Sequence, residues 1–317
     1  MALRGSRWLL RELDPASAAP QTPAPVEVPR TSRALALPDG LDEPTLRRIY
    51  STWSVDGEPA GHLDPYVGDS FERFVHTYEL AAATSGRCLE LGANPYFTTY
   101  LLDDHTDLDL TLANFFGQDG GTLTQVLAFE DAEGKPVERS YECDLFNIED
   151  RRFPYDDGSF EVVLFCEILE HLLMDPVGVL TEIRRVLVDD GCLVLTTPNV
   201  ARFDNACRLV TGENIYDPYS GFGPYGRHNR EYTMRELRAL LAFVGFEVEE
   251  AFSGDGHPTD HRGLAHAADI APLVTDRPDL LGGYLYVRAV KSGEVSAGLP
   301  DFLYRSWPAD RLVSAPL

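Results

Sequence analysis

Short apolar runs of strand length alternate with stretches of helical periodicity through most of this 317-residue chain. The predicted strands are residues 87–91, 108–116, 160–165, 192–197, 246–252 and 283–290. The predicted helices are residues 46–53, 71–83, 96–102, 177–188 and 234–244. Two more apolar segments, residues 126–129 and 137–143, flank a turn signal and predict a β-hairpin. Strands that alternate with helices predict an α/β fold with a doubly wound, mostly parallel sheet.

Composition divides the chain into four predicted parts. Residues 1–40 form a flexible N-terminal extension, because residues 15–38 are rich in Pro and Ala and lack apolar periodicity. We expect a helical N-terminal cap at residues 41–84, the α/β domain at 85–292 and a C-terminal tail at 293–317.

The charge and the cysteines limit the partners and the compartment. With 27 Lys+Arg against 51 Asp+Glu, the net charge is −24, so we expect neither nucleic acid nor an anionic membrane as a partner. The five cysteines lack CxxC spacing and indicate small core residues in a reducing compartment. The apolar patch Trp8-Leu9-Leu10 is interrupted by Arg11 too early for a signal-peptide core. We therefore predict a cytoplasmic protein, and we make no prediction of its oligomeric state.

The segment from Glu167 to His171 follows the buried strand at residues 160–165 and is predicted to begin a helix. Positions i, i+3 and i+4 share one face of a helix, so Glu167, Glu170 and His171 are expected to point the same way. Open α/β sheets bind ligands at the carboxyl ends of their strands. These side chains therefore indicate a metal site, an acid–base site or the ordinary polar start of a helix.

A second candidate site follows the strand at residues 87–91, where the chain reads Glu90-Leu91-Gly92-Ala93-Asn94. Gly92 lets the backbone approach a ligand closely, and Asn94 tolerates left-handed backbone geometry. A carboxylate just before such a turn suits a ligand with an amino group. The sequence here lacks the G-x-G-x-x-G fingerprint of dinucleotide-binding turns.

Taken in order, these motifs resemble those of the class I S-adenosylmethionine-dependent methyltransferases over about residues 85–250. The first motif of that family, E/D-x-G-x-G-x-G, corresponds to residues 90–96, where Asn94 and Tyr96 replace the second and third glycines. Further segments that resemble the family, from the approach to its fourth strand through its fifth, are residues 153–163, 180–187 and 191–199. The resemblance implies a Rossmann-like sheet of seven strands.

The resemblance also implies S-adenosyl-L-methionine (SAM) as the cofactor, bound at the carboxyl ends of the first four strands. Asn114 lies where the family has an acidic residue for the ribose hydroxyls, and an amide can also hydrogen-bond a hydroxyl. Asp144 matches the acidic residue on the adenine side. The cofactor-binding residues expected from the resemblance are Glu90, Gly92, Asn94, Asn114, Asp144, Leu145 and Cys166.

The Glu-x-x-Glu-His segment resembles two groups within this family, the ubiquinone-pathway O-methyltransferases and the small-RNA 2′-O-methyltransferases. In the second group these side chains and a later histidine hold a divalent cation, and His228 occupies a comparable place here. The resemblance implies a site for Mg²⁺ or Mn²⁺ made by Glu167, Glu170, His171 and His228. Without a metal, His171 or His228 is the expected catalytic base, because the pKa of histidine lies near working pH.

We predict a SAM-dependent methyltransferase that O-methylates a hydroxyl of a sugar, glycoside or secondary metabolite, with assistance from the metal. The loop at residues 214–226 is rich in Gly, Pro and aromatic residues and indicates either a flat substrate-binding wall or a packed surface loop. One alternative is an RNA ribose 2′-O-methyltransferase, which the acidic charge opposes. Another is a non-catalytic SAM-binding scaffold protein, which the altered glycine motif suggests. N- or C-methylation of the acceptor also stays open.

Overall fold

The computed structural model describes residues 33–117, 120–150, 152–256 and 264–317. Most of the predicted flexible extension, residues 1–40, lies outside these described residues. Where the described chain begins, the Arg33 guanidinium pairs with Glu79 and Glu250. Within the described ranges, no helix combines the length and the apolar character needed to cross a membrane.

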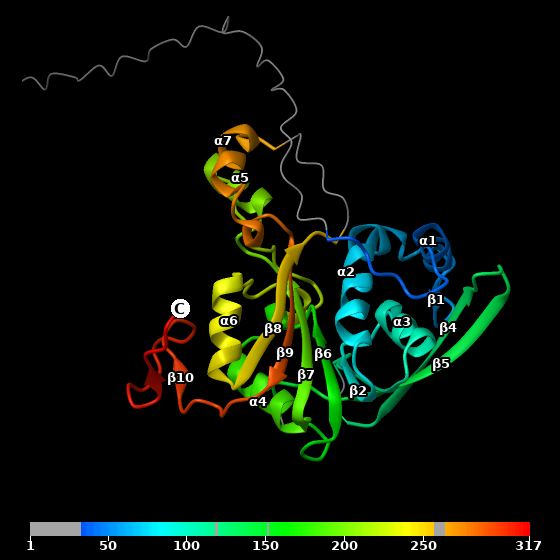
Figure 1. The fold of residues 1–317 in the computed structure, drawn as a ribbon, viewed down its shortest axis with the longest axis horizontal. Helices are drawn as coiled ribbons and strands as arrows, with labels where there is room; N and C mark the ends of the chain where they lie inside the picture. The colour runs from blue at the N-terminus through cyan, green and yellow to red at the C-terminus, as the bar shows by residue number, and fades with distance from the viewer. Residues whose placement is uncertain (1–32, 118–119, 151, 257–263) are drawn as a thin grey trace, which may run out of the picture.

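A single nine-stranded sheet forms the centre of the fold (Figure 1). Its middle strands run parallel in the order β5-β3-β2-β6-β7, which confirms the predicted doubly wound parallel centre. Their bounds are Pro136–Leu145 (β5), Leu108–Asn114 (β3), Gly86–Leu91 (β2), Phe160–Cys166 (β6) and Leu187–Pro198 (β7). Beyond β7, the strands β9 (Tyr284–Lys291) and β8 (Phe246–Gly254) complete one edge in antiparallel orientation.

The sheet has two strands more than the seven expected, and both lie beyond β5. Strand β4 (Thr122–Glu130) pairs antiparallel with β5, and the short β1 (Ser54–Val55) pairs with β4. The predicted hairpin is confirmed, but its first strand is longer than its apolar run and joins the main sheet. The turn fixes the register, because Oδ1 of Asp131 accepts hydrogen bonds from the N–H groups of Glu133 and Lys135.

Helices cover both faces of the sheet (Figure 1). On one face lie α1 (Glu43–Ser51), α2 (Asp64–Ala82) and α3 (Phe97–His105), and on the other lie α4 (Pro176–Val186) and α6 (Met234–Phe243). Strand β6 contributes alternate residues to each side: Val162 and Leu164 join the α1–α3 cluster, while Val163 and Phe165 join the α4–α6 cluster. An apolar run without polar alternation is what a parallel strand between two helix layers requires.

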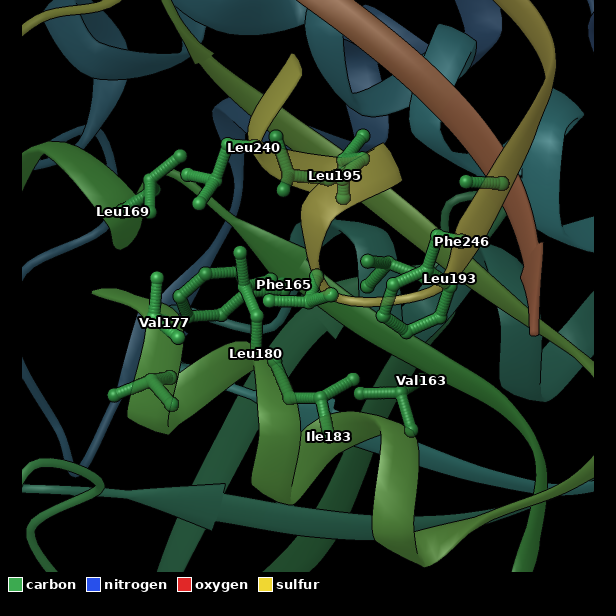
Figure 2. Close-up of a cluster of buried hydrophobic side chains, with 14 of the residues drawn as sticks. Val163, Phe165, Leu169, Val177, Leu180, Ile183, Leu193, Leu195, Leu240 and Phe246 are labelled. Carbon is green, nitrogen blue, oxygen red and sulfur yellow. The ribbon is translucent and has the colours of Figure 1, made fainter. Parts of the chain in front are cut away.

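Figure 2 shows the cluster on the α4–α6 side. Leu180 and Ile183 of α4 and Leu240 of α6 are fully buried there against the central strands. This packing fixes where β6 and β7 end, and so fixes the edge of the sheet at which the candidate site lies.

The sequence encodes the starts of both helices on this face. Asp175 caps α4 by accepting a hydrogen bond from the N–H of Gly178, and Pro176 occupies its first turn. Thr233 and Glu236 form a reciprocal capping box at the start of α6. This box holds the segment that precedes α6, which carries His228.

Two outer parts pack beside this core. Helices α5 (Phe203–Thr211) and α7 (Ala267–Val274) lie together away from the main sheet and share a small apolar cluster (Figure 1). In the C-terminal tail, β10 (Leu299–Pro300) pairs with β11 (Leu312–Val313), and Tyr304 is buried against the α4–α6 cluster.

Residues 167–171 do not form the helix that their spacing predicts. Glu167 has a φ of 56°, in the left-handed region, and its N–H donates to the carbonyl of Thr196. This bond continues the pairing of β6 with β7, so the chain cannot turn into a helix at that point. Only a short 3₁₀ turn, η1 (Leu169–His171), follows. The expectation that Glu167, Glu170 and His171 share a helix face is therefore wrong.

Candidate functional site

Two adjoining cavities lie at the carboxyl ends of the central strands. The α2 cavity, of about 340 Å³, is lined by α2, the turn after β2 and the segment after β6. The Tyr225 cavity, of about 160 Å³, is lined by the ends of β2 and β3, the segments after β5 and β6, and Tyr225. The residues that both cavities share are Leu91, Gly92, Asn114, Phe115, Glu167 and Ile168.

Gly92 is the backbone element of this shared wall. Its φ is 74°, and a Cβ placed on it meets Cδ1 of Ile168 at 2.9 Å. The positive φ favours glycine at this position, and a side chain there would also make Ile168 shift. The predicted close approach of the Gly92 backbone to a ligand stays a prediction.

Glu90 lines the α2 cavity and is only 6% exposed. Its Oε2 accepts a hydrogen bond of 2.7 Å from the hydroxyl of Thr99 on α3. Burial raises the pKa of Glu90 to about 8, and the Thr99 bond offsets only part of this effect. A cationic ligand group in the cavity would favour the ionised form of this carboxyl group.

Three other predicted residues also reach the cavities. Asn114 lines both of them at the end of β3. Asn94 lines the α2 cavity, and its side-chain amide donates to Gln125 at 3.1 Å. Cys166 lines the same cavity at the end of β6, and burial raises its pKa to about 12, so its thiol stays protonated.

Asp144 and Leu145 are not among the described residues that line the two cavities. Oδ2 of Asp144 instead accepts a hydrogen bond of 2.7 Å from the hydroxyl of Tyr155. Asn147, three residues later, does line the Tyr225 cavity and donates to the Tyr225 hydroxyl at 3.1 Å. The polar group at this end of the site is thus displaced along the chain from the predicted position.

The structure adds Arg73, a residue that the sequence reasoning missed. It lies on α2, is 6% exposed and lines the α2 cavity. Its Nη2 donates to the Tyr66 hydroxyl at 2.8 Å, and its Nε lies 3.9 Å from Oε2 of Glu167. Within the described part of the chain, Nε has no hydrogen-bond partner. The buried guanidinium therefore has a free hydrogen-bond donor at the cavity. The sequence did contain a signal for this residue, because an Arg between Phe71 and Phe74 in an apolar stretch of a helix is unusual.

Glu170, His171 and His228 converge beside the Tyr225 cavity, which His171 lines. One ligand atom from each lies within 4.8 Å of the others. Nε2 of His171 is 3.7 Å from Oε1 of Glu170, and the two imidazole rings lie 5.0 Å apart at 76°. The later histidine predicted from the resemblance is thus brought to the motif by the chain that precedes α6.

Each of the two imidazoles is oriented by a hydrogen bond at its Nδ1 atom. Nδ1 of His171 lies 2.9 Å from the carbonyl oxygen of Arg227, and Nδ1 of His228 lies 2.9 Å from Oε1 of Glu231. Both partners can only accept, so each Nδ1 carries a proton, and Nε2 of His171 is left to face Glu170. Arg202 in turn pairs with the other oxygen of Glu231.

The carboxylate of Glu170 is half satisfied. Oε2 accepts a hydrogen bond of 2.9 Å from Thr197, whereas Oε1 is buried without a hydrogen-bond partner among the described residues. Burial, together with the charge of Glu167, raises the pKa of Glu170 to about 8. A buried carboxylate oxygen without a hydrogen-bond partner, beside two imidazoles, needs either a proton or a cation.

Glu167, the fourth predicted ligand, is not part of this cluster of described residues. Its Oε1 accepts a hydrogen bond from Thr196 at 2.8 Å, and its Oε2 faces Arg73 across the α2 cavity. Both oxygens of the Glu167 carboxylate thus face groups outside the cluster. The four-residue metal prediction is therefore reduced to three convergent ligands.

An open α/β sheet with this strand order, a glycine turn after β2 and a cavity across the ends of β2, β3 and β6 defines a nucleotide-type cofactor-binding domain. Residues 60–251 match the family model described as "Methyltransferase domain". The chain belongs to this family, the class I SAM-dependent methyltransferases.

Known proteins with similar sequences or folds carry related names. A probable SAM-dependent methyltransferase of Mycolicibacterium smegmatis is 31% identical over 131 residues, which are 39% of this chain. The match spans 46% of that protein, about half its length. A SAM-dependent methyltransferase structure from Archaeoglobus fulgidus has 14% identity and a TM-score of 0.44, covering 72% of this chain and 91% of that one. The 1,6-didemethyltoxoflavin-N1-methyltransferase of Burkholderia thailandensis has 14% identity and a TM-score of 0.40, covering 72% and 81%.

Proposed function

We propose that this chain transfers a methyl group from SAM to a hydroxyl of a sugar, glycoside or similar polyhydroxylated metabolite. The observation that carries the proposal is the convergence of Glu170, His171 and His228 at the wall of the cofactor cavity. Two imidazoles and a carboxylate suit a divalent transition metal such as Mn²⁺, with open positions, better than Mg²⁺, because Mg²⁺ prefers oxygen ligands. Such a site fits an acceptor that offers adjacent oxygen atoms.

In this proposal the α2 cavity holds the methionine portion of SAM. Arg73 binds the carboxylate with its unused Nε donor, and Glu90 faces the ammonium group. Asn114 binds the ribose, and the apolar side chains of Ile168 and Leu172 in the Tyr225 cavity pack on the adenine. The sulfonium then lies near Gly92 and Ile168, where the two cavities meet.

The three cluster residues fit a cation by their chemistry. The buried Oε1 of Glu170 has no hydrogen-bond partner among the described residues, Nε2 of His171 lies 3.7 Å from it, and a ring nitrogen of His228 completes the cluster within 4.8 Å. A divalent cation bound there supplies a Lewis acid that chelates neighbouring hydroxyls and lowers the pKa of the one to be methylated.

The transfer itself is a single displacement. The acceptor oxygen forms a bond to the methyl carbon, the carbon–sulfur bond breaks, and its electron pair stays on the sulfur of S-adenosylhomocysteine (SAH). The hydroxyl proton passes to Nε2 of His171, or to solvent where that nitrogen holds a cation. The protein contributes chiefly position and exclusion of water.

Calorimetric titration with SAM and SAH, with and without EDTA, tests the donor half of the proposal. We expect both to bind at a single site. A protein without affinity for either would overturn the whole proposal. The acceptor half is tested by measuring the formation of SAH from SAM in the presence of each member of a panel of glycosides and catechols, with Mg²⁺, Mn²⁺ or EDTA. Turnover that EDTA leaves unchanged would exclude a role for the metal.

A ribose 2′-O-methyltransferase is the second candidate, because a terminal RNA ribose also offers adjacent hydroxyls to such a cluster. The charge of −24 opposes it. Methylation of an RNA 3′ end that falls steeply with added salt would favour it over the glycoside acceptor.

A further inference from the structure

The segment that orients the cluster also carries the most exposed aromatic side chains of its neighbourhood. Tyr216, Tyr219 and Phe222 are 79%, 92% and 95% exposed. Single exposed apolar residues are ordinary, but three large aromatic rings within seven residues are costly to leave in water. Their position therefore calls for an explanation.

Backbone and side-chain contacts tie this segment to the cluster at several points. Asp217, next to Tyr216, accepts a hydrogen bond of 3.0 Å from the N–H of His228. The Arg227 carbonyl holds His171, and the Arg227 guanidinium lies 4.7 Å from the centroid of the Tyr219 ring. The loop is thus anchored beneath its aromatic side chains, which stay free to meet a ligand.

A second group of exposed apolar side chains, a pair of residues, lies close to the cluster in the chain. Leu173 and Met174, just after His171, are 40% and 68% exposed. Their N–H groups are both held by the carboxylate of Glu149, so the pair is fixed in place. The 3₁₀ turns beside the two segments contact each other: η1 precedes Leu173, and η2 (Pro224–Gly226) follows Phe222. We call Leu173, Met174, Tyr216, Tyr219 and Phe222 the apolar rim.

The apolar rim lies close to the cluster along the chain, and its residues line neither of the two cavities. The proposed function assigns both adjoining cavities to SAM, so the body of the acceptor lies outside them. A free sugar would leave the rim in water, and an anionic polymer is disfavoured by the charge of the chain. A molecule with a hydroxylated head and an apolar body satisfies the cluster and the rim together.

We propose that the acceptor is an amphiphile: a glycoside whose hydroxylated head lies at Glu170, His171 and His228 and whose apolar aglycone packs on the apolar rim. The inference rests on the proposed function and narrows its substrate class. The apolar body can be a flat aromatic system or an alkyl chain, since both bury surface against Tyr219 and Phe222.

The probes are the methyl, n-octyl and 2-naphthyl glycosides of the same sugar, for several sugars, added to protein loaded with SAH and Mg²⁺. Binding is measured by calorimetry and by tryptophan and naphthyl fluorescence. We expect the naphthyl or octyl glycoside to bind at least about tenfold more tightly than the methyl glycoside. Which of the two binds better identifies the aromatic or the alkyl body.

The double variant Tyr219→Ala/Phe222→Ala should lower the affinity for the apolar glycoside about tenfold and keep the affinity for SAH. Leu273→Ala is the matched control, because Leu273 is 74% exposed but lies on α7. Equal affinities for methyl and apolar glycosides, or no binding of any of them, would overturn the inference. So would a double variant that changes only the oligomeric state, which would make the rim a contact between two copies. If the unsubstituted protein did not bind SAH, that result would instead contradict the proposed function itself.

Discussion

Nδ1 of His228 lies 2.9 Å from Oε1 of Glu231, whose other oxygen pairs with Arg202. This pairing decides which nitrogen of His228 faces the cluster. Burial lowers the pKa of His228, but the Glu231 bond and the charges of Glu170 and Asp217 outweigh it and raise the pKa overall. Glu231 therefore positions a residue of the site from outside it.

Glu231→Gln should lower the affinity for Mn²⁺ about ten- to a hundredfold, because an amide can orient the imidazole but does not increase its basicity. Titration of the SAH-loaded protein with Mn²⁺, followed by electron paramagnetic resonance, measures the change. Arg230→Ala is the control, since Arg230 pairs with Glu236 and is exposed. Equal Mn²⁺ affinity in Glu231→Gln and the parent protein would remove the positioning role.

Substitution of Glu170 should weaken metal binding, whereas substitution of Glu167 should weaken cofactor binding. We expect Glu170→Gln to weaken Mn²⁺ binding at least tenfold and to leave SAH affinity within about twofold, because only Glu170 faces the two imidazoles. Glu167→Gln should do the reverse, since Glu167 faces Arg73 across the cofactor cavity. The same two titrations on both variants check this, and equal metal loss in the two would restore Glu167 as a ligand.

Arg73→Met should lower the affinity for SAM about ten- to a hundredfold, because it removes a charged donor from the carboxylate but keeps the volume of the side chain. Decarboxylated SAM provides the matched ligand. In the parent protein it should bind more weakly than SAM, and Arg73→Met should not weaken it further. A variant that loses affinity for both ligands equally would show that Arg73 acts on the fold instead of on the carboxylate.

Glu90 should make the ligand-free protein lose stability as the pH rises. Burial raises the pKa of Glu90 to about 8 in the folded state, above its ordinary value, so the folded state retains a proton that the unfolded chain releases. The stabilisation is fully present below about pH 4.5 and is lost as the pH passes through about 8.

Urea unfolding at pH 5, 7 and 9 measures this dependence. Glu90→Gln should flatten the decline between pH 5 and 9, because the amide cannot lose a proton. Glu133→Gln, a change at an exposed turn residue, is the control. A decline of the same size in Glu90→Gln and the parent protein would contradict the assignment.

The apolar runs were enough to predict the parallel centre of the sheet, whereas the glycine turn indicated a ligand site only together with the motifs that follow it. Residues 88–91 of β2 and 162–165 of β6 are buried without alternation, as a strand covered on both faces requires. Gly92 has a positive φ, which favours glycine and is therefore recorded in the sequence motif.

The site residues were harder to predict because their placement depends on backbone dihedral angles. The spacing of Glu167, Glu170 and His171 suits a helix. The N–H of Glu167 instead donates to Thr196 on another strand, and the local sequence contains no sign of this long-range hydrogen bond. The pair Asp175-Pro176 did signal that the helix begins later. Arg73 was missed because helical periodicity says which face is buried but not that a charge on it lines a cavity.

His171 is held by the main-chain carbonyl of Arg227 and not by its side chain. Any residue type at position 227 offers the same carbonyl, so the chain can exchange this side chain freely as long as the loop keeps its course. Asn229 differs, because its N–H donates to the carbonyl of Glu170 and its side-chain amide donates to the carbonyls of His171 and Pro224. Relatives with the same histidine geometry can therefore differ at position 227, and the part of the loop that meets the acceptor can diversify while the chemistry beneath it stays constant.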